Sequence, residues 1–373
     1  MSKPGRIAIE WSGALLLCLV AVELGLRLQQ WLGPLYDLAL KGETLDWYSD
    51  VVNHKPVPHQ LQRFEGEVIY GSHAGFTYTL EYDDNGVRQP VSTGAHADCR
   101  AKASILFMGD SFMQGYDVAH SVPERVAQDL AAKQGICSTA YNAGFTSYSP
   151  AIFVPLARRL MPVVKPDYVV VDIDETDLTD DVYRYESLIV RNAAGENVGV
   201  RASPTNADIS RRLSLAERSP FYIQRLVEKL YVRLMLMPRI AANQPDVFRF
   251  ARDKERDLET KYRAELSIFR RNIAELIGVL AKGLPATSRI VFVHHPHLQQ
   301  LTSQWNELLA STVEKVATEH GALFFDATPV LQHKFGDKPQ LYYWSGDMHF
   351  TFDGLDFYAD SVAAFLGGVV SPR

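Results

Sequence analysis

The sequence has little of several features that mark large classes of protein. Only 3 of its 373 residues are cysteine, which excludes a scaffold held mainly by disulfides. It contains no basic run and has a formal net charge of −6, so we expect no nucleic-acid partner. A Gly-rich phosphate loop, a Cys/His spacing typical of zinc and an internal repeat are all missing. We therefore expect no cofactor.

What is present is typical of a globular protein with one large domain. Hydrophobic residues make up 47% of the chain and charged residues 22%. Short apolar runs alternate with amphipathic stretches, which predicts a parallel sheet with right-handed helical crossovers. We predict a three-layer α/β/α fold with a doubly wound, parallel five-stranded sheet. The expected strands cover residues 104–108, 139–142, 168–171, 289–293 and 322–325, and the expected helices cover 123–133, 151–161, 300–320 and 353–365.

The most informative segment is Gly109-Asp110-Ser111, directly after the apolar run 105–108. Glycine permits a sharp turn at the end of a strand. The serine then lies at the carboxyl end of a parallel strand, where open α/β sheets build their sites. This position makes Ser111 a candidate nucleophile, although three such common residues also occur together in ordinary turns.

A second segment supplies what a nucleophilic serine requires. Asp347 and His349 lie two residues apart, about 240 residues after Ser111 and just before the last expected helix. A serine needs a base to accept its proton, and the base needs an acid to hold its tautomer. We therefore expect His349 to be the base and Asp347 to orient it.

Together these two segments resemble the first and last blocks of the SGNH, or GDSL, hydrolase family. The resemblance implies a flavodoxin-like fold, a catalytic triad of Ser111, His349 and Asp347, and no metal. The segment Tyr141-Asn142-Ala143-Gly144-Phe145 resembles the second block of that family. It implies that the backbone N–H groups of Ser111 and Gly144 bind the developing oxyanion.

The third block departs from the family pattern. Thr176, in Asp174-Glu175-Thr176-Asp177, stands where the family has an asparagine that donates to the oxyanion. A threonine hydroxyl can donate one hydrogen bond, so we expect Thr176 to be the third oxyanion donor. The alternative is a structural turn residue whose hydroxyl is bonded to nearby backbone.

Three histidines raise the question of a metal. His294, His295 and His297 follow the expected strand 289–293, and histidines after a strand can bind a metal ion. No carboxylate or further histidine stands at a supporting sequence spacing. We therefore predict no metal site and expect one of these histidines to line the active-site cleft.

The first 30 residues are a separate unit. Residues 7–28 are mostly apolar, Trp11 and Trp31 flank a length that matches a bilayer core, and Lys3 and Arg6 precede it. We predict an uncleaved single-pass anchor in the inner (cytoplasmic) membrane, with the catalytic domain periplasmic or otherwise extracytoplasmic. A signal peptide and a buried helix of a soluble protein remain alternatives.

The rest of the chain divides into an approach segment and the main domain. Residues 31–100 are expected to form a small β layer, and residues 101–373 the hydrolase domain, with an insertion at 183–285. The insertion is expected to wall the active site. The elements expected outside the main alternation are strands at 67–70 and 76–82, a hairpin at 188–200, and helices beginning near residues 219 and 258.

Two cysteines precede neighbouring parallel strands. Cys99 and Cys137 should therefore lie at the same edge of the sheet, where an oxidising compartment would permit a bridge. Two unpaired thiols are the alternative. Cys18 lies within the apolar N-terminal segment and is expected to be an apolar filler.

The function expected from these features is that of a serine esterase or acyltransferase. Its expected substrates are small-molecule or glycan esters, above all O-acetyl groups of an extracytoplasmic glycan, as the family resemblance and the anchor imply. Proteins of a glycan-modifying system are expected partners, and the N-terminal helix is expected to contact the membrane. Two alternatives remain: a lipid-directed esterase or thioesterase, and a non-catalytic glycan-binding or assembly protein with the same fold.

Overall fold

The computed structural model divides the chain into two compact units, residues 1–48 with 202–244 and residues 49–201 with 245–373. The expected insertion 183–285 is therefore shared between both units. The residues described are 3–28, 59–68, 72–83, 85–88, 91–93, 99, 101–116, 120–201, 203–239, 246–286, 289–302, 305–344 and 348–370.

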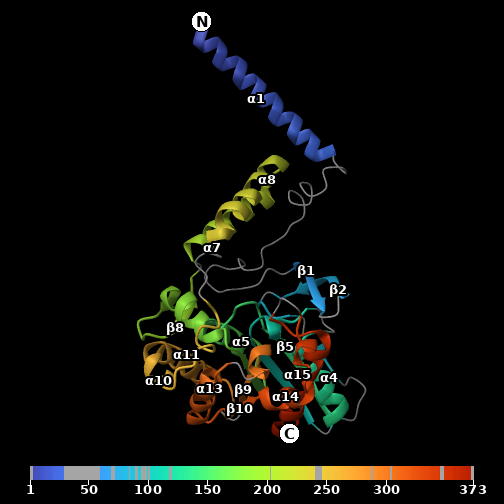
Figure 1. Ribbon diagram of the computed structural model, residues 1–373, viewed down its shortest axis with the longest axis vertical. Helices are drawn as coiled ribbons and strands as arrows, with labels where there is room; N and C mark the ends of the chain where they lie inside the picture. Colours follow the sequence, from blue (N-terminus) through green and yellow to red (C-terminus); the bar gives the residue numbers. More distant parts are fainter. Residues whose placement is uncertain are drawn as a thin grey trace. The chain divides into compact units, whose positions relative to one another are not determined.

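A six-stranded sheet forms the centre of the larger unit, in the order β10-β9-β6-β4-β5-β3 (Figure 1). Its five parallel strands are those expected from the sequence. The sixth strand, β3 (Val91–Ser92), pairs antiparallel with β5 and is too short to show a sequence pattern. The parallel strands are β4 (Ala101–Met108), β5 (Ile136–Asn142), β6 (Tyr168–Ile173), β9 (Ile290–His294) and β10 (Leu323–Asp326).

Helices cover both faces of this sheet. Side chains alternate along β4, so that Ile105 and Phe107 pack into one apolar core and Leu106 and Met108 into the other, all fully buried. Burial on both faces explains why the strands read as continuous apolar runs. The expected three-layer arrangement is therefore confirmed. The helices are α4 (Val122–Gln134) and α15 (Phe352–Val369) on one face, and α5 (Pro150–Val164), α11 (Arg263–Ala281) and α13 (Leu308–Glu319) on the other (Figure 1).

One expected helix is divided. The sequence predicts a single helix over 300–320, but the structure has α12 (Leu298–Leu301) and α13. Asn306 lies between them, accepting a hydrogen bond from the Leu308 N–H and donating to the carbonyls of Phe250 and Ala251. These tertiary bonds fix a non-helical backbone there, which helical periodicity does not reveal.

The β-rich additions agree with expectation in part. Strand β1 (His59–Val68) pairs antiparallel with β2 (Ser72–Glu81), which covers most of the expected strand 76–82. The expected strand 67–70 extends beyond the end of β1, and its last two residues lie outside the described chain. The expected hairpin is present as β7 (Ile189–Arg191) and β8 (Asn197–Val200). The helix expected near residue 258 is present as α10 (Leu258–Lys261) and α11.

The smaller unit contains helices from both ends of its sequence range. Glu23 of α1 (Lys3–Leu28) accepts hydrogen bonds from the backbone N–H groups of Tyr222 and Ile223, at 3.1 and 2.9 Å. Arg27 donates to the carbonyl of Pro220 at 2.7 Å. Glu23 therefore satisfies the free N–H groups at the start of α8. The other helices here are α7 (Pro204–Arg218), α8 (Tyr222–Tyr231) and the π-helical η4 (Val232–Leu236).

The expected membrane anchor is not supported by these helices. Within the described parts of the chain, none of the helices combines the length and the apolar character that crossing a bilayer requires. Residues 3–28 do form a helix, as expected, but Glu23 near its end has a protein partner.

Cys99 and Cys137 are joined in a disulfide, with their Cα atoms 5.6 Å apart. Strands β4 and β5 begin beside one another, with Ala101 opposite Ile136, and so bring the two cysteines to the same edge. Of the two alternatives left open by the sequence, the structure has the bridge. Cys18 is a free, exposed cysteine.

Candidate active site

Ser111 begins the short helix α3 (Ser111–Gln114), immediately after β4. A Cβ atom at Gly109 would lie 2.6 Å from Met113 Cβ and 3.0 Å from Asp172 Cβ, so only glycine fits at this turn. Asp110 caps α3 by accepting a hydrogen bond from the Phe112 N–H at 2.8 Å. The tight turn leaves Ser111 partly exposed at the carboxyl edge of the sheet.

The structure brings Ser111 and His349 together. His349 Nε2 lies 2.7 Å from Ser111 Oγ, within hydrogen-bonding distance, although 238 residues separate the two in sequence. The loop that carries His349 is held by the backbone, because the Trp344 N–H donates to the His349 carbonyl at 3.0 Å. A serine hydroxyl bonded to a partly exposed imidazole is the arrangement that activates a nucleophile.

The third member of the expected triad, Asp347, lies outside the described residues. Its role in orienting His349 therefore remains a prediction.

Gly144 lies against the helix that begins with the nucleophile. A Cβ atom at this position would be 2.5 Å from Gln114 N and 2.7 Å from Met113 C, so this close backbone approach requires glycine. Its N–H donates to Asn142 Oδ1 at 3.0 Å. The expected oxyanion donor is thus close to the nucleophile's helix but is already hydrogen-bonded.

Thr176 is engaged elsewhere. Its hydroxyl donates to Asp174 Oδ1 at 2.6 Å, and its backbone N–H donates to the same oxygen at 2.8 Å. The hydroxyl is thus bonded locally, as in the turn alternative, but its acceptor is a side-chain carboxylate and not the backbone. The expected third oxyanion donor has its proton committed to Asp174. Among the described residues, the Ser111 N–H is the one expected donor for which no acceptor competes.

Behind the nucleophile lies a buried cluster of carboxylates and imidazoles at the ends of β6 and β9. His295 Nδ1 is 3.0 Å from Asp172, and Tyr358 donates to Asp172 Oδ1 at 2.5 Å. His297 Nε2 is 2.8 Å from Asp174 Oδ2, and His295 Nε2 is 3.5 Å from the same oxygen. All five residues are at most 2% exposed. Two of the three histidines noted in the sequence therefore have carboxylate partners from another strand.

The third histidine, His294, belongs to a different group of contacts. Its Nδ1 lies 3.0 Å from Asp326 and its Nε2 lies 3.7 Å from Glu175. Burial alone would lower the pKa of His294, but the hydrogen bonds and charges of Asp326 and Glu175 raise it to about 9.

Burial and neighbouring charges shift the pKa values of several groups around the cluster. Burial, reinforced by the charge of Asp174, raises the pKa of Asp110 to about 7. Burial and the charges of Asp174 and Asp110 also raise the pKa of Asp177 well above its ordinary value. Burial would lower the pKa of His295, but the charges of Asp172 and Asp174 raise it well above the usual range. The raised pKa values of Asp110 and Asp177 reduce the negative charge that these two carboxyl groups bring to the cluster.

The Phe112 ring contacts both the Ser111–His349 pair and the buried cluster of carboxylates and imidazoles. Its centroid lies 4.8 Å from that of His349 and 4.0 Å from that of His295. Sequence reasoning missed Phe112, Tyr358, Asp172 and Asp174. The available signal was the pair of aspartates, two residues apart at the end of an apolar strand, which places both near the carboxyl edge of the sheet.

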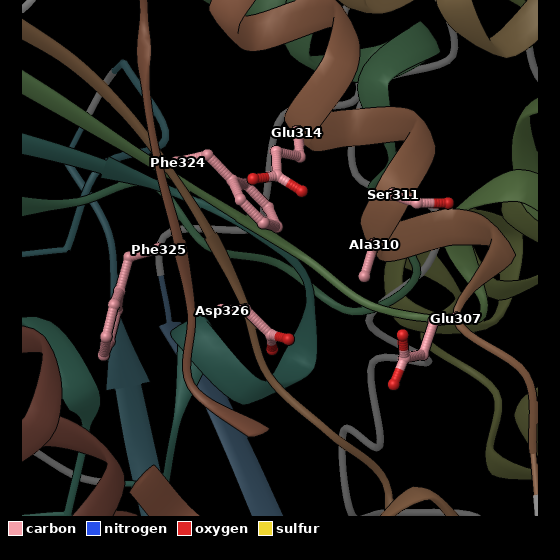
Figure 2. A pocket seen from close by; sticks show the side chains of 7 residues that line it. All are labelled: Glu307, Ala310, Ser311, Glu314, Phe324, Phe325 and Asp326. Atoms are coloured by element: carbon pink, nitrogen blue, oxygen red, sulfur yellow. The ribbon is translucent and has the colours of Figure 1, made fainter. Parts of the chain in front are cut away.

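A separate surface pocket of about 320 Å³ lies at the edge of the sheet, between β10 and α13 (Figure 2). It includes none of the expected site residues. Carboxylates line much of it, and Asp326 also contacts His294. The lining residues are Glu307, Ala310, Ser311, Glu314, Phe324, Phe325 and Asp326.

Comparison with known proteins finds distant structural likeness. No family model matches the chain, and no curated protein matches its sequence. A lipase/acylhydrolase from Enterococcus faecalis aligns over 72% of this chain and 98% of its own, with 12% identity and a TM-score of 0.39. An acetylxylan esterase from Geobacillus stearothermophilus aligns over 73% and 96%, with 14% identity and a TM-score of 0.38.

A third solved structure, an alpha/beta hydrolase enzyme from the metagenome of Lake Arreo, aligns over 73% of this chain and 98% of its own. Its identity is 14% and its TM-score 0.39. At TM-scores below 0.5 the likeness adds nothing to the functional case, which rests on the side chains.

Proposed function

We propose that this chain is a serine esterase or acyltransferase that works through an acyl-enzyme on Ser111. The observation that carries the proposal is the 2.7 Å contact between Ser111 Oγ and His349 Nε2. His349 accepts the hydroxyl proton as Oγ attacks the ester carbonyl, and it then donates that proton to the leaving alcohol. Water or a sugar hydroxyl attacks the acyl-enzyme in a second step, which distinguishes an esterase from an acyltransferase.

The oxyanion of the tetrahedral intermediate is bound by the backbone N–H of Ser111. Gly144 contributes a second donor if its N–H exchanges the Asn142 oxygen for the oxyanion, which carries more charge. Thr176 contributes indirectly, because its hydrogen bonds fix the carboxylate of Asp174.

The proposed substrate class is O-acyl, above all O-acetyl, groups on an extracytoplasmic glycan. A partly exposed aromatic pair supports a sugar ligand: the Phe248 and Trp305 ring centroids are 4.7 Å apart, and both rings contact His297. The edge of His297 in turn contacts Phe112, next to the nucleophile. Such aromatic faces can pack against the apolar face of a sugar ring.

Labelling with a fluorophosphonate tests the nucleophile. The full-length protein should be labelled, and Ser111→Ala should not. Ser311→Ala serves as the matched control, because it removes a serine of the surface pocket and should label like the wild type. Absence of labelling in a folded wild-type protein would contradict the proposal that Ser111 is a nucleophile.

Substrate chain length separates the glycan esterase from the lipid-directed alternative. Acetyl and long-chain p-nitrophenyl esters are compared in the same assay, and we expect the acetyl ester to have the higher kcat/KM. Preference for the long chain would favour the lipid-directed esterase or thioesterase instead. Transfer of acetyl to an added oligosaccharide would assign the acyltransferase.

One observation favours a non-catalytic alternative. Two of the three expected oxyanion donors, the Gly144 N–H and the Thr176 hydroxyl, are hydrogen-bonded within the protein. A glycan-binding or assembly protein with this fold needs no free oxyanion donors. It would bind acetylated oligosaccharide without fluorophosphonate labelling and without turnover.

The proposed compartment is oxidising and extracytoplasmic, supported by the disulfide between Cys99 and Cys137. Alkaline phosphatase fused after residue 373 should be active in cells, and non-reduced peptides should contain the linked cysteines. An inactive fusion, or free thiols in protein isolated from its native compartment, would contradict this assignment. Attachment to a membrane and partner proteins of a glycan-modifying system are further proposals that the compartment does not require.

A further inference from the structure

Three buried side chains at the carboxyl ends of β6 and β9 direct donor atoms toward one point. Asp174 Oδ2 lies 2.8 Å from His297 Nε2 and 3.5 Å from His295 Nε2, and all three atoms lie within 4.8 Å of one another. Tetrahedral zinc, with bonds of about 2.0–2.1 Å, separates its ligand atoms by about 3.3 Å. The two Asp174 distances bracket that spacing, so small side-chain shifts would bring them to it.

The other sides of these ligands are already held. His295 Nδ1 contacts Asp172, which accepts a hydrogen bond from the Tyr358 hydroxyl. Asp174 Oδ1 accepts both hydrogen bonds from Thr176, which leaves Oδ2 directed at the two histidines. A histidine whose second nitrogen is bonded to a carboxylate is the usual arrangement at a metal.

His297 is fixed by the backbone instead. It is the N-cap of α12, and its own N–H donates to the side chain of Gln300 at 2.7 Å.

An independent observation concerns one buried nitrogen of this group. His295 is fully buried, yet its Nε2 atom has no hydrogen-bond partner and faces Asp174 Oδ2 across 3.5 Å. A buried polar atom without a partner is costly. A divalent ion at the point shared by the three donor atoms would give this nitrogen a partner.

We propose that Asp174, His295 and His297 bind one divalent transition-metal ion, with Zn²⁺ as the best match. Two imidazole nitrogens and one carboxylate suit Zn²⁺, Co²⁺ or Fe²⁺, whereas Ca²⁺ and Mg²⁺ prefer oxygen ligands alone. The ion would lie next to the Phe112 ring, whose other contacts include His349. Its role is to hold the wall behind the catalytic imidazole, and no step of acyl transfer passes through it.

The competing arrangement contains no ion. In it, His295 and His297 are paired directly with Asp172 and Asp174 in a buried network.

Metal titration of the purified full chain distinguishes the two arrangements. After dialysis against a chelator, the protein is titrated with Zn²⁺ by calorimetry and with Co²⁺ by visible absorption. We expect one equivalent of each metal to bind, Co²⁺ with the intense bands of a four-coordinate site, and Zn²⁺ to raise the Tm by several degrees. Failure of folded wild-type protein to bind one equivalent at micromolar free metal overturns the proposal, whatever the variants do.

Variants locate the bound ion. His295→Gln and His297→Gln should each weaken Co²⁺ binding at least 100-fold. His294→Gln is the matched control, because His294 is adjacent and equally buried but is paired with Asp326 and Glu175, and it should bind like the wild type. Binding that survives in both folded ligand variants, or that is lost only in His294→Gln, would also overturn the site. Ser111→Ala should retain full binding, so failure of the acyl-enzyme proposal and failure of the metal proposal are separable.

Discussion

His349 and His295 both contact the Phe112 ring at the carboxyl edge of the sheet, and their surroundings differ in almost every respect. His349 is partly exposed, lies on a loop and contacts the Ser111 hydroxyl. His295 is fully buried at the end of β9 and lies between two carboxylates, with its Phe112 contact at 4.0 Å.

The difference decides which histidine is able to act as a base. Burial alone would lower the pKa of His295, but the carboxylates beside it outweigh burial and raise that pKa well above the usual range. A general base must accept and release a proton near the working pH, and it needs access to the substrate. His349 has a hydroxyl partner and a path to solvent. His349 therefore has the surroundings that the proposed general base requires, and those of His295 suit a structural role instead.

The largest effect is expected from removing the exposed pair. Ser111→Ala and His349→Ala should each lower kcat by roughly 10⁴–10⁶-fold, and the double variant should lose little more, because the two groups act as a unit. Single-turnover kinetics with an acetyl ester measure both. If the fold-losses in kcat of the two single variants multiplied in the double variant, the two side chains would be acting independently.

Removing the buried histidine should affect stability instead. His295→Ala removes the imidazole that contacts Asp172, while Asp174 keeps His297, and we expect a loss of about 3–5 kcal/mol in the free energy of unfolding. His349→Ala is the matched control and should change that free energy by less than about 0.5 kcal/mol. Urea unfolding in the presence of a chelator measures both variants. If His295→Ala and His349→Ala lost equal amounts of the free energy of unfolding, burial would not distinguish the two histidines.

The exposed half of this comparison was predictable from the sequence, and the buried half was not. Ser111 and His349 each stand in a short local motif beside a clear strand or helix signal, and the five parallel strands follow from apolar runs alone. The buried cluster pairs Asp172 with His295 and Asp174 with His297, each across 123 residues. Such pairs depend on β6 and β9 lying side by side, which no local spacing encodes.

Long-range contacts explain two other departures from expectation, and a local contact explains a third. Asn306 divides an expected helix by binding carbonyls more than 50 residues away, and Glu23 of the N-terminal helix caps a helix 199 residues later in the chain. Thr176 was expected at the oxyanion from the family pattern, but the adjacent Asp174 takes its hydroxyl proton. Each of these contacts is made by a polar side chain whose partner was not identifiable from the pattern.

Thr176 offers an intermediate test of the comparison, because it touches the buried cluster but was expected in the exposed site. Thr176→Val keeps the shape and removes the hydrogen bond to Asp174, so we expect a loss of about 1.5–3 kcal/mol in stability. Turnover per folded molecule should stay within about twofold, and Thr176→Ser should resemble the wild type in both respects. A 10²–10³-fold fall in kcat at an unchanged Tm would instead place the hydroxyl at the oxyanion.

The smallest effect is expected where a carboxylate is paired at the surface. Asp360 of α15 accepts hydrogen bonds from Lys133 and Lys334, at 2.8 and 2.6 Å, and its side chain is 33% exposed. Burial alone would raise the pKa of Asp360, but the two lysines outweigh it and hold the pKa below its ordinary value. The folded state therefore binds this proton more weakly than the unfolded chain. The resulting stabilisation is present above the unfolded pKa of about 3.8 and is lost as the pH falls through the folded pKa.

Asp360→Asn should accordingly cost less than about 1 kcal/mol at pH 7, since water and salt screen an exposed pair. The gap in Tm between wild type and variant should narrow below about pH 4 and shrink in 1 M NaCl, where the Debye length is about 3 Å. Lys133→Met removes one partner only and should give a smaller gap with the same pH dependence. A loss as large as that expected for His295→Ala would mean that exposure does not govern the strength of these pairs, and the contrast between the two histidines would need another cause.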